Sequence, residues 1–240
     1  MLFVLRMLLM GLHFILAGVL GLVLGMCRPF NPDNSRLCAR LYAWPAMRIL
    51  GLRVKAEVGT LADKPRSCVI IANHQSNYDL FVFGNVVPYR TVCIGKKSLK
   101  WVPLFGQLFW LAGNVLIDRA NAIRARRSML TTTHTLQHQE TSIWVFPEGT
   151  RNLGRELLPF KKGAFQMAIA AGVPIVPVCV SNYVNHMQLN RWRSGDILIR
   201  SLPAIPTAGL TMDDMPQLIA QCREQMRECI ASMDQEVQGA

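Results

Sequence analysis

Acidic residues are scarce in this 240-residue chain: 15 Asp and Glu stand against 26 Lys and Arg, which gives a formal net charge of +11 at pH 7. Such an excess favours anionic partners, among them nucleic acid, anionic lipid headgroups, phosphorylated substrates and an acidic carrier protein. The net charge alone does not choose among these partners.

Patterns typical of metal and redox sites are also missing. The seven cysteines are odd in number and scattered, with neither a C-x-x-C pair nor a Cys/His zinc pattern. They are expected to be reduced and mostly buried, as in a chain that faces the cytosol. His134 and His138 stand four apart on a helical pattern, but no Glu lies between them and no third ligand is evident, so no metal is expected.

The chain has one long apolar run, residues 7–27, flanked by Arg6 and Arg28; it contains no Asp, Glu, Lys or Arg, and His13 is its one histidine. About 20 apolar residues suffice for a helix to cross a bilayer. A cleaved signal peptide is not favoured, because no small-x-small cleavage site follows. A spanning helix, a shallow re-entrant or interfacial pair and a buried core helix stay open. Four glycines would permit a turn or close helix packing: Gly11, Gly18, Gly21 and Gly25.

Residues 28–52 interleave Arg36, Arg40 and Arg48 with apolar side chains, the pattern of a basic amphipathic helix. Such a helix lies on a membrane surface or connects to the domain and packs on it. We therefore expect residues 1–52 to form a membrane-associated helical segment and residues 53–240 to form the main domain.

From residue 53 onwards, short β-branched runs alternate with helical patterns, and no repeat or low-complexity tract appears. This alternation predicts an α/β fold with a mostly parallel sheet flanked by helices. The clearest helical patterns lie at 121–138, 162–171 and 215–233, the last with Thr211 as an expected cap. The expected strands are 53–58, 68–72, 91–94, 115–117, 142–146, 175–180 and 197–201.

Residues 70–79 form an apolar strand that ends in a polar cluster, and sheets of this class bind ligands at the carboxyl ends of their strands. Five residues along a helix would turn Asp79 about 140° away from His74. The two side chains can therefore meet only if His74 lies on the turn before the helix. If they meet, Asp79 accepts the proton of one imidazole nitrogen and leaves the other as a base near neutral pH. By itself the spacing is a weak signal, and it favours a His and an Asp that merely cap a turn.

Three further blocks have chemical character. Residues 143–151 form a second strand ending in polar residues, and Arg151 offers a planar fork suited to phosphate. Residues 95–106 place Lys96, Lys97 and Lys100 beside aromatic and apolar residues, which suits an anionic headgroup with an apolar tail. The third block is an apolar strand bracketed by prolines, expected to form a hydrophobic wall for an acyl chain: Val173, Pro174, Ile175, Val176 and Pro177.

Taken in their order along the chain, the four blocks resemble those of the glycerolipid acyltransferases, most closely the bacterial 1-acylglycerol-3-phosphate acyltransferases. The resemblance runs from about residue 68 to residue 180. Its most specific parts are F-P-E-G-T-R at residues 146–151 and N-H-x-S-x-x-D at Asn73, His74, Ser76 and Asp79. Residues 113–119 also look like a family segment, whereas the lysine block is the most variable one in the family.

The resemblance implies transfer of a fatty acyl chain from coenzyme A or acyl carrier protein to the sn-2 hydroxyl of lysophosphatidic acid, giving phosphatidic acid. The thioester is then a co-substrate, and no cofactor is needed. His74 would be the general base and Asp79 its orienting partner. Arg151 and the lysines would neutralise the phosphate, with Gly149 and Thr150 in the same substrate-binding block, while Glu148 would hold the glycerol or brace Arg151. The expected place is the cytoplasmic side of the inner membrane.

Two alternatives stay open. One is an acyltransferase for glycerol 3-phosphate or another lysolipid. The other is a basic membrane-binding or nucleic-acid-binding protein without catalysis, for which the nearest feature is a cluster of Arg119, Arg124, Arg126 and Arg127. No aromatic platform or nucleic-acid motif accompanies that cluster, so no nucleic-acid partner is expected. The sequence leaves the oligomeric state undetermined.

Overall fold

The computed structural model describes residues 1–63, 67–118 and 140–239. These residues contain seven strands in one sheet, ordered β1-β7-β6-β2-β5-β3-β4, and every neighbouring pair is parallel except β6 with β7. The predicted mostly parallel sheet is confirmed, with all seven expected strands present. Their bounds are β1 (Leu52–Glu57), β2 (Val69–Ala72), β3 (Thr91–Lys96), β4 (Val115–Ile117), β5 (Ser142–Val145), β6 (Ile175–Val180) and β7 (Gly195–Ser201).

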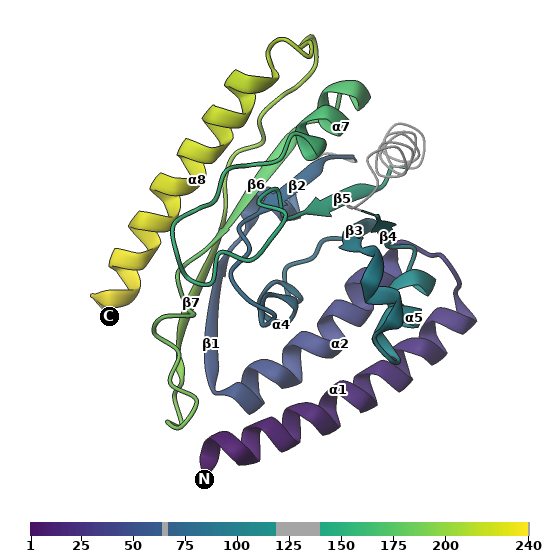
Figure 1. The fold of residues 1–240 in the computed structure, drawn as a ribbon, viewed down its shortest axis with the longest axis vertical. Helices are drawn as coiled ribbons and strands as arrows, with labels where there is room; N and C mark the ends of the chain where they lie inside the picture. The colour runs from purple at the N-terminus through teal and green to yellow at the C-terminus, as the bar shows by residue number, and fades with distance from the viewer. Residues whose placement is uncertain (64–66, 119–139, 240) are drawn as a thin grey trace.

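Helices cover both faces of the sheet. Figure 1 shows α7 and α8 on one face and α1, α2, α4 and α5 on the other. The expected helix at 121–138 lies outside the described residues, as do the arginine cluster 119–127 and the histidines at 134 and 138. The bounds are α1 (Leu2–Cys27), α2 (Asp33–Leu50), α3 (Gly59–Ala62), α4 (Asp79–Phe83), the 3-10 helix η1 (Lys97–Trp101), α5 (Phe105–Leu111), α7 (Gly163–Ala171) and α8 (Met215–Gln238).

Alternate residues of each central strand feed two separate cores. In β2, Ile70 and Ala72 join a cluster with residues of α1, α2 and α4, whereas Val69 and Ile71 join a cluster with α7 and α8. All four side chains are fully buried. Strands covered on both faces read as continuous apolar runs, which is why β2 and β6 lack polar residues.

The N-terminal apolar run forms one uninterrupted helix, and α2 runs back along it (Figure 1). Three of its four glycines serve close packing, and none forms a turn. A Cβ placed on Gly21 would lie 2.7 Å from Leu108 of α5, and a Cβ on Gly18 or Gly25 would likewise lie close to Leu104 or Leu111, whereas nothing lies within 4 Å of a Cβ on Gly11. The absence of side chains at these three positions lets the C-terminal part of α1 pack closely on α5 and Leu104.

The two faces of α1 differ sharply. Arg6 and Met10 on the inner face are buried, whereas Leu8, Leu12 and Leu16 on the outer face are more than half exposed. Among the described residues, α1 alone is long and apolar enough to cross a membrane, with a mean hydropathy of 2.4 and only 17% of that window buried. Such low burial does not fit a helix of the protein core.

α2 packs on the domain, which was one of the two alternatives predicted for it, and keeps arginines on its exposed face. Tyr42, Ala46 and Leu50 are buried against the domain, while Arg40 and Arg48 lie exposed on the opposite face. The expected cap of α8 is wrong. The helix starts at Met215, after Asp214, and the Thr211 hydroxyl donates to the Asp214 carboxylate over 2.8 Å without reaching the helix backbone.

Candidate active site

The polar clusters predicted from the sequence meet at one edge of the sheet. β2, β5 and β6 run parallel as neighbours, so the turns after Ala72, Val145 and Val180 lie side by side. Side chains from positions 73–79, 146–152 and 181–183 are therefore brought together from distant parts of the chain. This is the edge at which parallel sheets commonly bind ligands.

His74 and Asp79 are in contact. Imidazole Nδ1 lies 2.6 Å from Asp79 Oδ2. Helix α4 begins only at Asp79, so His74 stands on the preceding turn and the angular separation of a helix does not apply. Asp79 is 1% exposed, whereas the His74 side chain is 23% exposed. The carboxylate is thus shielded from water while the imidazole stays accessible.

Both Asp79 oxygens are occupied. Oδ2 also accepts the backbone N–H groups of Gln75 and Ser76, over 2.7 and 2.9 Å, and Oδ1 accepts the Tyr183 hydroxyl over 2.6 Å. Since an ionised carboxylate only accepts hydrogen bonds, the proton of the imidazole lies on Nδ1. The lone pair of His74 Nε2 is then the free base.

An aromatic ring stacks on one face of the His74 imidazole. The ring of Phe146 stacks on His74 with centroids 4.2 Å apart and planes 18° from parallel. The Phe146 ring in turn packs against the ring of Phe83 of α4, with ring centroids 5.9 Å apart. One face of the imidazole is therefore covered, which limits approach to its free edge and other face.

Amide side chains tie the β2 turn to β6. Asn73 donates to the Val180 carbonyl over 2.9 Å and accepts the Val180 N–H over 2.8 Å. Gln75 donates to the Ser181 carbonyl over 2.9 Å. Buried hydrogen bonds of this kind extend the sheet ladder past the last residue of β2 and fix the backbone on either side of His74.

Glu148 is buried at the turn that carries His74. Its carboxylate is 2% exposed and accepts the backbone N–H of His74 over 2.7 Å, the N–H of Leu158 over 2.9 Å and the Asn152 amide over 3.2 Å. Burial raises the pKa of Glu148, and these three hydrogen bonds partly oppose that effect. Glu148 therefore braces the turn that carries His74, while Arg151 donates to Asn77 over 2.6 Å.

A second cation, Lys161, lies against Gly149 of the turn that carries Arg151. Gly149 has a φ of +68°, and a Cβ there would lie 2.9 Å from the ammonium nitrogen of Lys161. The Lys161 backbone N–H also donates to the Pro147 carbonyl over 2.8 Å. Thr150, Arg151 and Lys161 are all exposed. Lys161 was missed because it lies ten residues beyond the motif, where Lys161 and Lys162 look like a solvated pair.

The lysines expected at the phosphate site differ in their surroundings. Lys96 ends β3 and is exposed, Lys97 pairs with Asp118 over 3.1 Å, and the Lys100 ammonium lies 4.4 Å from the centre of the Trp101 ring. Because β3 is parallel to β5, these residues follow its carboxyl end on the same edge of the sheet as His74. Lys96 and Lys100 are thus the two without an acidic partner in these contacts.

The expected acyl-chain wall is not brought to this edge. Val173 and Pro174 precede β6, and Ile175 pairs with Val69 at the start of β2, so these residues lie at the opposite edge from His74. Ile175, Val176 and Pro177 are buried inside the sheet. The apolar pattern reflects a strand covered on both faces and not a surface for a lipid chain.

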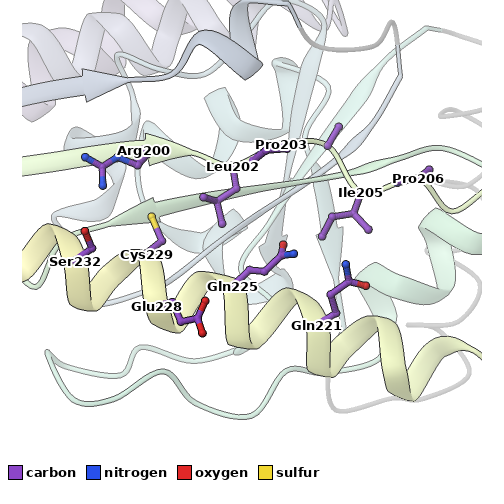
Figure 2. A pocket seen from close by; sticks show the side chains of 11 residues that line it. Arg200, Leu202, Pro203, Ile205, Pro206, Gln221, Gln225, Glu228, Cys229 and Ser232 are labelled. Carbon is purple, nitrogen blue, oxygen red and sulfur yellow. The ribbon is translucent and has the colours of Figure 1, made fainter.

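A cavity of about 530 Å³ lies elsewhere, between α8 and the end of β7 (Figure 2). Arg200, Ile205, Gln225 and Cys229 line it, and none of the residues around His74 does. In the part of the chain that the structure describes, no group of three or more His, Cys, Asp or Glu side chains is arranged to hold a metal ion.

The amino-acid sequence is similar to those of known acyltransferases. A family model described as "Acyltransferase" matches residues 55–181. The chain is 42% identical over 237 residues to the 1-acyl-sn-glycerol-3-phosphate acyltransferase of Escherichia coli (strain K12), covering 99% of this chain and 96% of the relative. It is 38% identical over 210 residues to the human 1-acyl-sn-glycerol-3-phosphate acyltransferase alpha, covering 87% of this chain and 74% of that one.

The fold is likewise similar to a solved structure. The crystal structure of the 1-acyl-sn-glycerophosphate (LPA) acyltransferase from Thermotoga maritima superposes with a TM-score of 0.73 at 21% identity, covering 97% of this chain and 98% of the other. At that identity the likeness concerns the fold alone, and it includes the N-terminal helices as well as the sheet.

Proposed function

This chain belongs to the acyltransferase family, and from that premise we propose that it acylates the sn-2 hydroxyl of 1-acyl-sn-glycerol 3-phosphate to give phosphatidic acid. The acyl donor is a thioester of coenzyme A or acyl carrier protein. Both donors are acidic and suit a chain with a net charge of +11.

The observation that carries the proposal is the 2.6 Å contact between His74 Nδ1 and Asp79 Oδ2 at an accessible sheet edge. His74 Nε2 takes the proton of the acceptor hydroxyl as that oxygen bonds to the thioester carbonyl carbon. The carbon–sulfur bond then breaks, and the leaving thiolate takes the proton from the imidazolium. No acyl-enzyme is needed, because the acceptor oxygen is the nucleophile. General-base assistance typically contributes about 10²- to 10⁴-fold.

Cations on the same edge suit the acceptor phosphate. Arg151 lies on the turn after β5, the Lys161 side chain lies against Gly149 of the same turn, and Lys96 and Lys100 lie at and just after the end of the neighbouring strand β3. Arg151 supplies the planar fork for two phosphate oxygens, and the lysines supply mobile point charges. Thr150 is exposed on the same turn and offers a hydroxyl.

The outer face of α1 fits a bilayer surface. Its leucines are exposed, while Arg6 on the inner face donates to the carbonyls of Leu189 and Trp192 over 2.8 Å. A helix pinned in this way cannot cross the bilayer without carrying the domain with it, so α1 lies flat in the interface. The seven cysteines, all of them among the described residues, form no disulfide bond, which fits the cytoplasmic side of the inner membrane.

Product analysis tests the proposal. Purified protein in mixed micelles receives an acyl thioester together with 1-acylglycerol 3-phosphate, glycerol 3-phosphate or a zwitterionic lysolipid, and the products are separated by mass. We expect phosphatidic acid as the main product and no turnover by His74→Ala. Comparable rates with glycerol 3-phosphate would make the chain an acyltransferase for another acceptor. Near-normal turnover by His74→Ala would remove the general base from the mechanism.

A further inference from the structure

The Tyr183 hydroxyl occupies the Asp79 oxygen that His74 does not use. It donates to Oδ1 over 2.6 Å, whereas His74 Nδ1 contacts Oδ2 over 2.6 Å. Tyr183 is 2% exposed and Asp79 is 1% exposed, so the contact is shielded from water. The carboxylate is therefore held from two sides, by the imidazole and by the phenol.

The hydroxyl does more than fill space. The Tyr183 ring belongs to the core cluster that includes residues of α2 and α4, and a phenylalanine ring would fill that volume equally well. A buried phenol hydroxyl needs a hydrogen-bond partner, and its partner here is the carboxylate that orients the base. Burial and the negative charge of Asp79 raise the pKa of Tyr183, so the hydroxyl stays protonated and keeps donating at neutral pH.

The backbone that carries Tyr183 is fixed by three other elements. Asn73 pairs with both backbone groups of Val180, three residues earlier. The Asn182 N–H donates to Asp234 of α8 over 2.6 Å. Farther along the same loop, Arg6 of α1 holds two carbonyls and the Ser194 hydroxyl. Tyr183 thus reaches Asp79 from a braced loop.

We propose that Tyr183 is a positioning residue for acyl transfer, whose hydroxyl fixes the Asp79 carboxylate so that His74 presents Nε2 to the acceptor hydroxyl. The proposal rests on the proposed function, and Tyr183 acts through Asp79 without touching the substrate. Without the hydroxyl, Oδ1 is buried and loses its donor, the carboxylate turns, and the imidazole loses its fixed orientation.

The hydroxyl also disperses the charge of Asp79. Without it, the carboxylate attracts the imidazolium proton more strongly, and the inactive protonated form persists to higher pH. Among the described residues, the titratable groups around His74, Asp79 and Tyr183 are Tyr78, which lies near Tyr183, Glu148, which accepts the His74 N–H, and the Tyr183 hydroxyl itself. Tyr183→Phe changes only the last of these.

The test compares Tyr183→Phe with Tyr89→Phe, which makes the same chemical change on a ring that is 61% exposed and lies under Arg36. Rates with 1-acylglycerol 3-phosphate and an acyl thioester are measured in mixed micelles from pH 5 to 9 and normalised to folded protein by thermal unfolding. For Tyr183→Phe we expect kcat to fall about tenfold, acceptor KM to change less than twofold, and the acid limb of the pH profile to move to higher pH. Tyr89→Phe should match the wild type in all three.

The outcomes separate this proposal from the one on which it rests. If the wild type forms no phosphatidic acid, the proposed function fails. If the wild type is active and Tyr183→Phe keeps its kcat within twofold, the positioning role is wrong. A lower kcat that only follows the loss of folded protein, with the acid limb unmoved, would also overturn it, because that result describes a residue of the core.

Discussion

The backbone N–H of His74 donates to Oε1 of Glu148 over 2.7 Å, which joins the turn after β2 to the turn after β5. The other Glu148 oxygen accepts the Leu158 N–H and the Asn152 amide. One buried carboxylate therefore fixes the turn that carries His74 relative to the turn that carries Arg151. The glutamate of the F-P-E-G-T-R motif is thus bonded to the turn of His74, whereas the arginine of the motif donates to Asn77.

Glu148→Ala should lower kcat strongly and reduce stability. The substitution leaves the N–H groups of His74 and Leu158 without an acceptor in a buried place, which costs about 1–3 kcal/mol each. Thermal unfolding and acceptor kinetics in the same detergent check both effects. An alanine variant with normal kcat and a raised acceptor KM would instead point to a direct contact between Glu148 and the glycerol.

The stability of the protein should carry a pH dependence from the same residue. Because burial raises the pKa of Glu148 above its usual 4.5, the unfolded state loses this proton first as pH rises. The contribution of Glu148 to stability therefore falls from about pH 4.5 upward and levels off above the folded-state pKa. Unfolding temperatures of the wild type and Glu148→Gln across pH 4–8 measure this contribution. The difference in unfolding temperature between the wild type and Glu148→Gln should shrink as the pH rises. A difference that grows with pH would contradict a raised pKa of Glu148.

Gly149→Ala should raise acceptor KM about tenfold. Its φ of +68° strains any L-residue, and the new Cβ would lie 2.7 Å from Lys161 Cε, so the lysine must move away. Gly172→Ala is the matched control: its φ is +66° and nothing lies within 4 Å of a Cβ there. Both variants should lose similar stability, and only Gly149→Ala should bind the acceptor less tightly. Equal KM values in the two variants would exclude Lys161 from the phosphate site.

The strands, and the candidate residues His74 and Asp79, were predictable from the sequence because they are marked by local patterns. Runs such as residues 69–72 and 175–180 are apolar without interruption, and the polar residues that follow mark the carboxyl ends of parallel strands. The contact between His74 and Asp79 could be stated only as a condition. It depends on where α4 begins, and helix boundaries depend in part on tertiary contacts such as the hydrogen bond from the Tyr183 hydroxyl to Asp79.

Other features depend on residues distant in the chain. Tyr183 reaches Asp79 across 104 positions, and Glu148 reaches His74 across 74. Neither pairing has a periodicity or spacing that a single sequence reveals. The prediction that residues 173–177 line an acyl chain has a related weakness. An apolar strand has the same sequence pattern whether its side chains face a lipid or, as in β6, two layers of helices.

Arg151→Ala should raise the acceptor KM by about 10- to 100-fold with a smaller effect on kcat, because charged hydrogen bonds to the phosphate form before the transition state and persist through it. Arg155→Ala removes the same charge from an exposed side chain four residues away and serves as the control. Steady-state kinetics with 1-acylglycerol 3-phosphate check the difference. Equal KM values in both variants would place the phosphate nearer the β3 lysines.

Attachment to the bilayer should depend on the outer face of α1. Leu12, Leu16 and Leu20 are 55%, 53% and 57% exposed. Their joint change to Gln keeps helix propensity and removes apolar area that a bilayer would otherwise cover. Since burying a leucine side chain contributes about 1.5–3 kcal/mol, affinity for anionic vesicles should fall at least roughly tenfold. Stability in detergent should hardly change, because these side chains touch little of the domain. Cosedimentation with vesicles and thermal unfolding measure the two quantities.

Met212→Gln provides the control, as it changes an exposed apolar side chain in the segment just before α8, the helix that covers the opposite face of the sheet from α1. Its vesicle affinity should equal that of the wild type. The position of α1 is tested on sealed vesicles to which the protein is added from outside. A helix that lies flat leaves Cys27 and an N-terminal tag both open to reagents that cannot cross the bilayer. Protection of the tag with Cys27 still labelled would mean that α1 spans the membrane, which requires Arg6 to leave the carbonyls of Leu189 and Trp192 and the loop of Tyr183 to lose its brace.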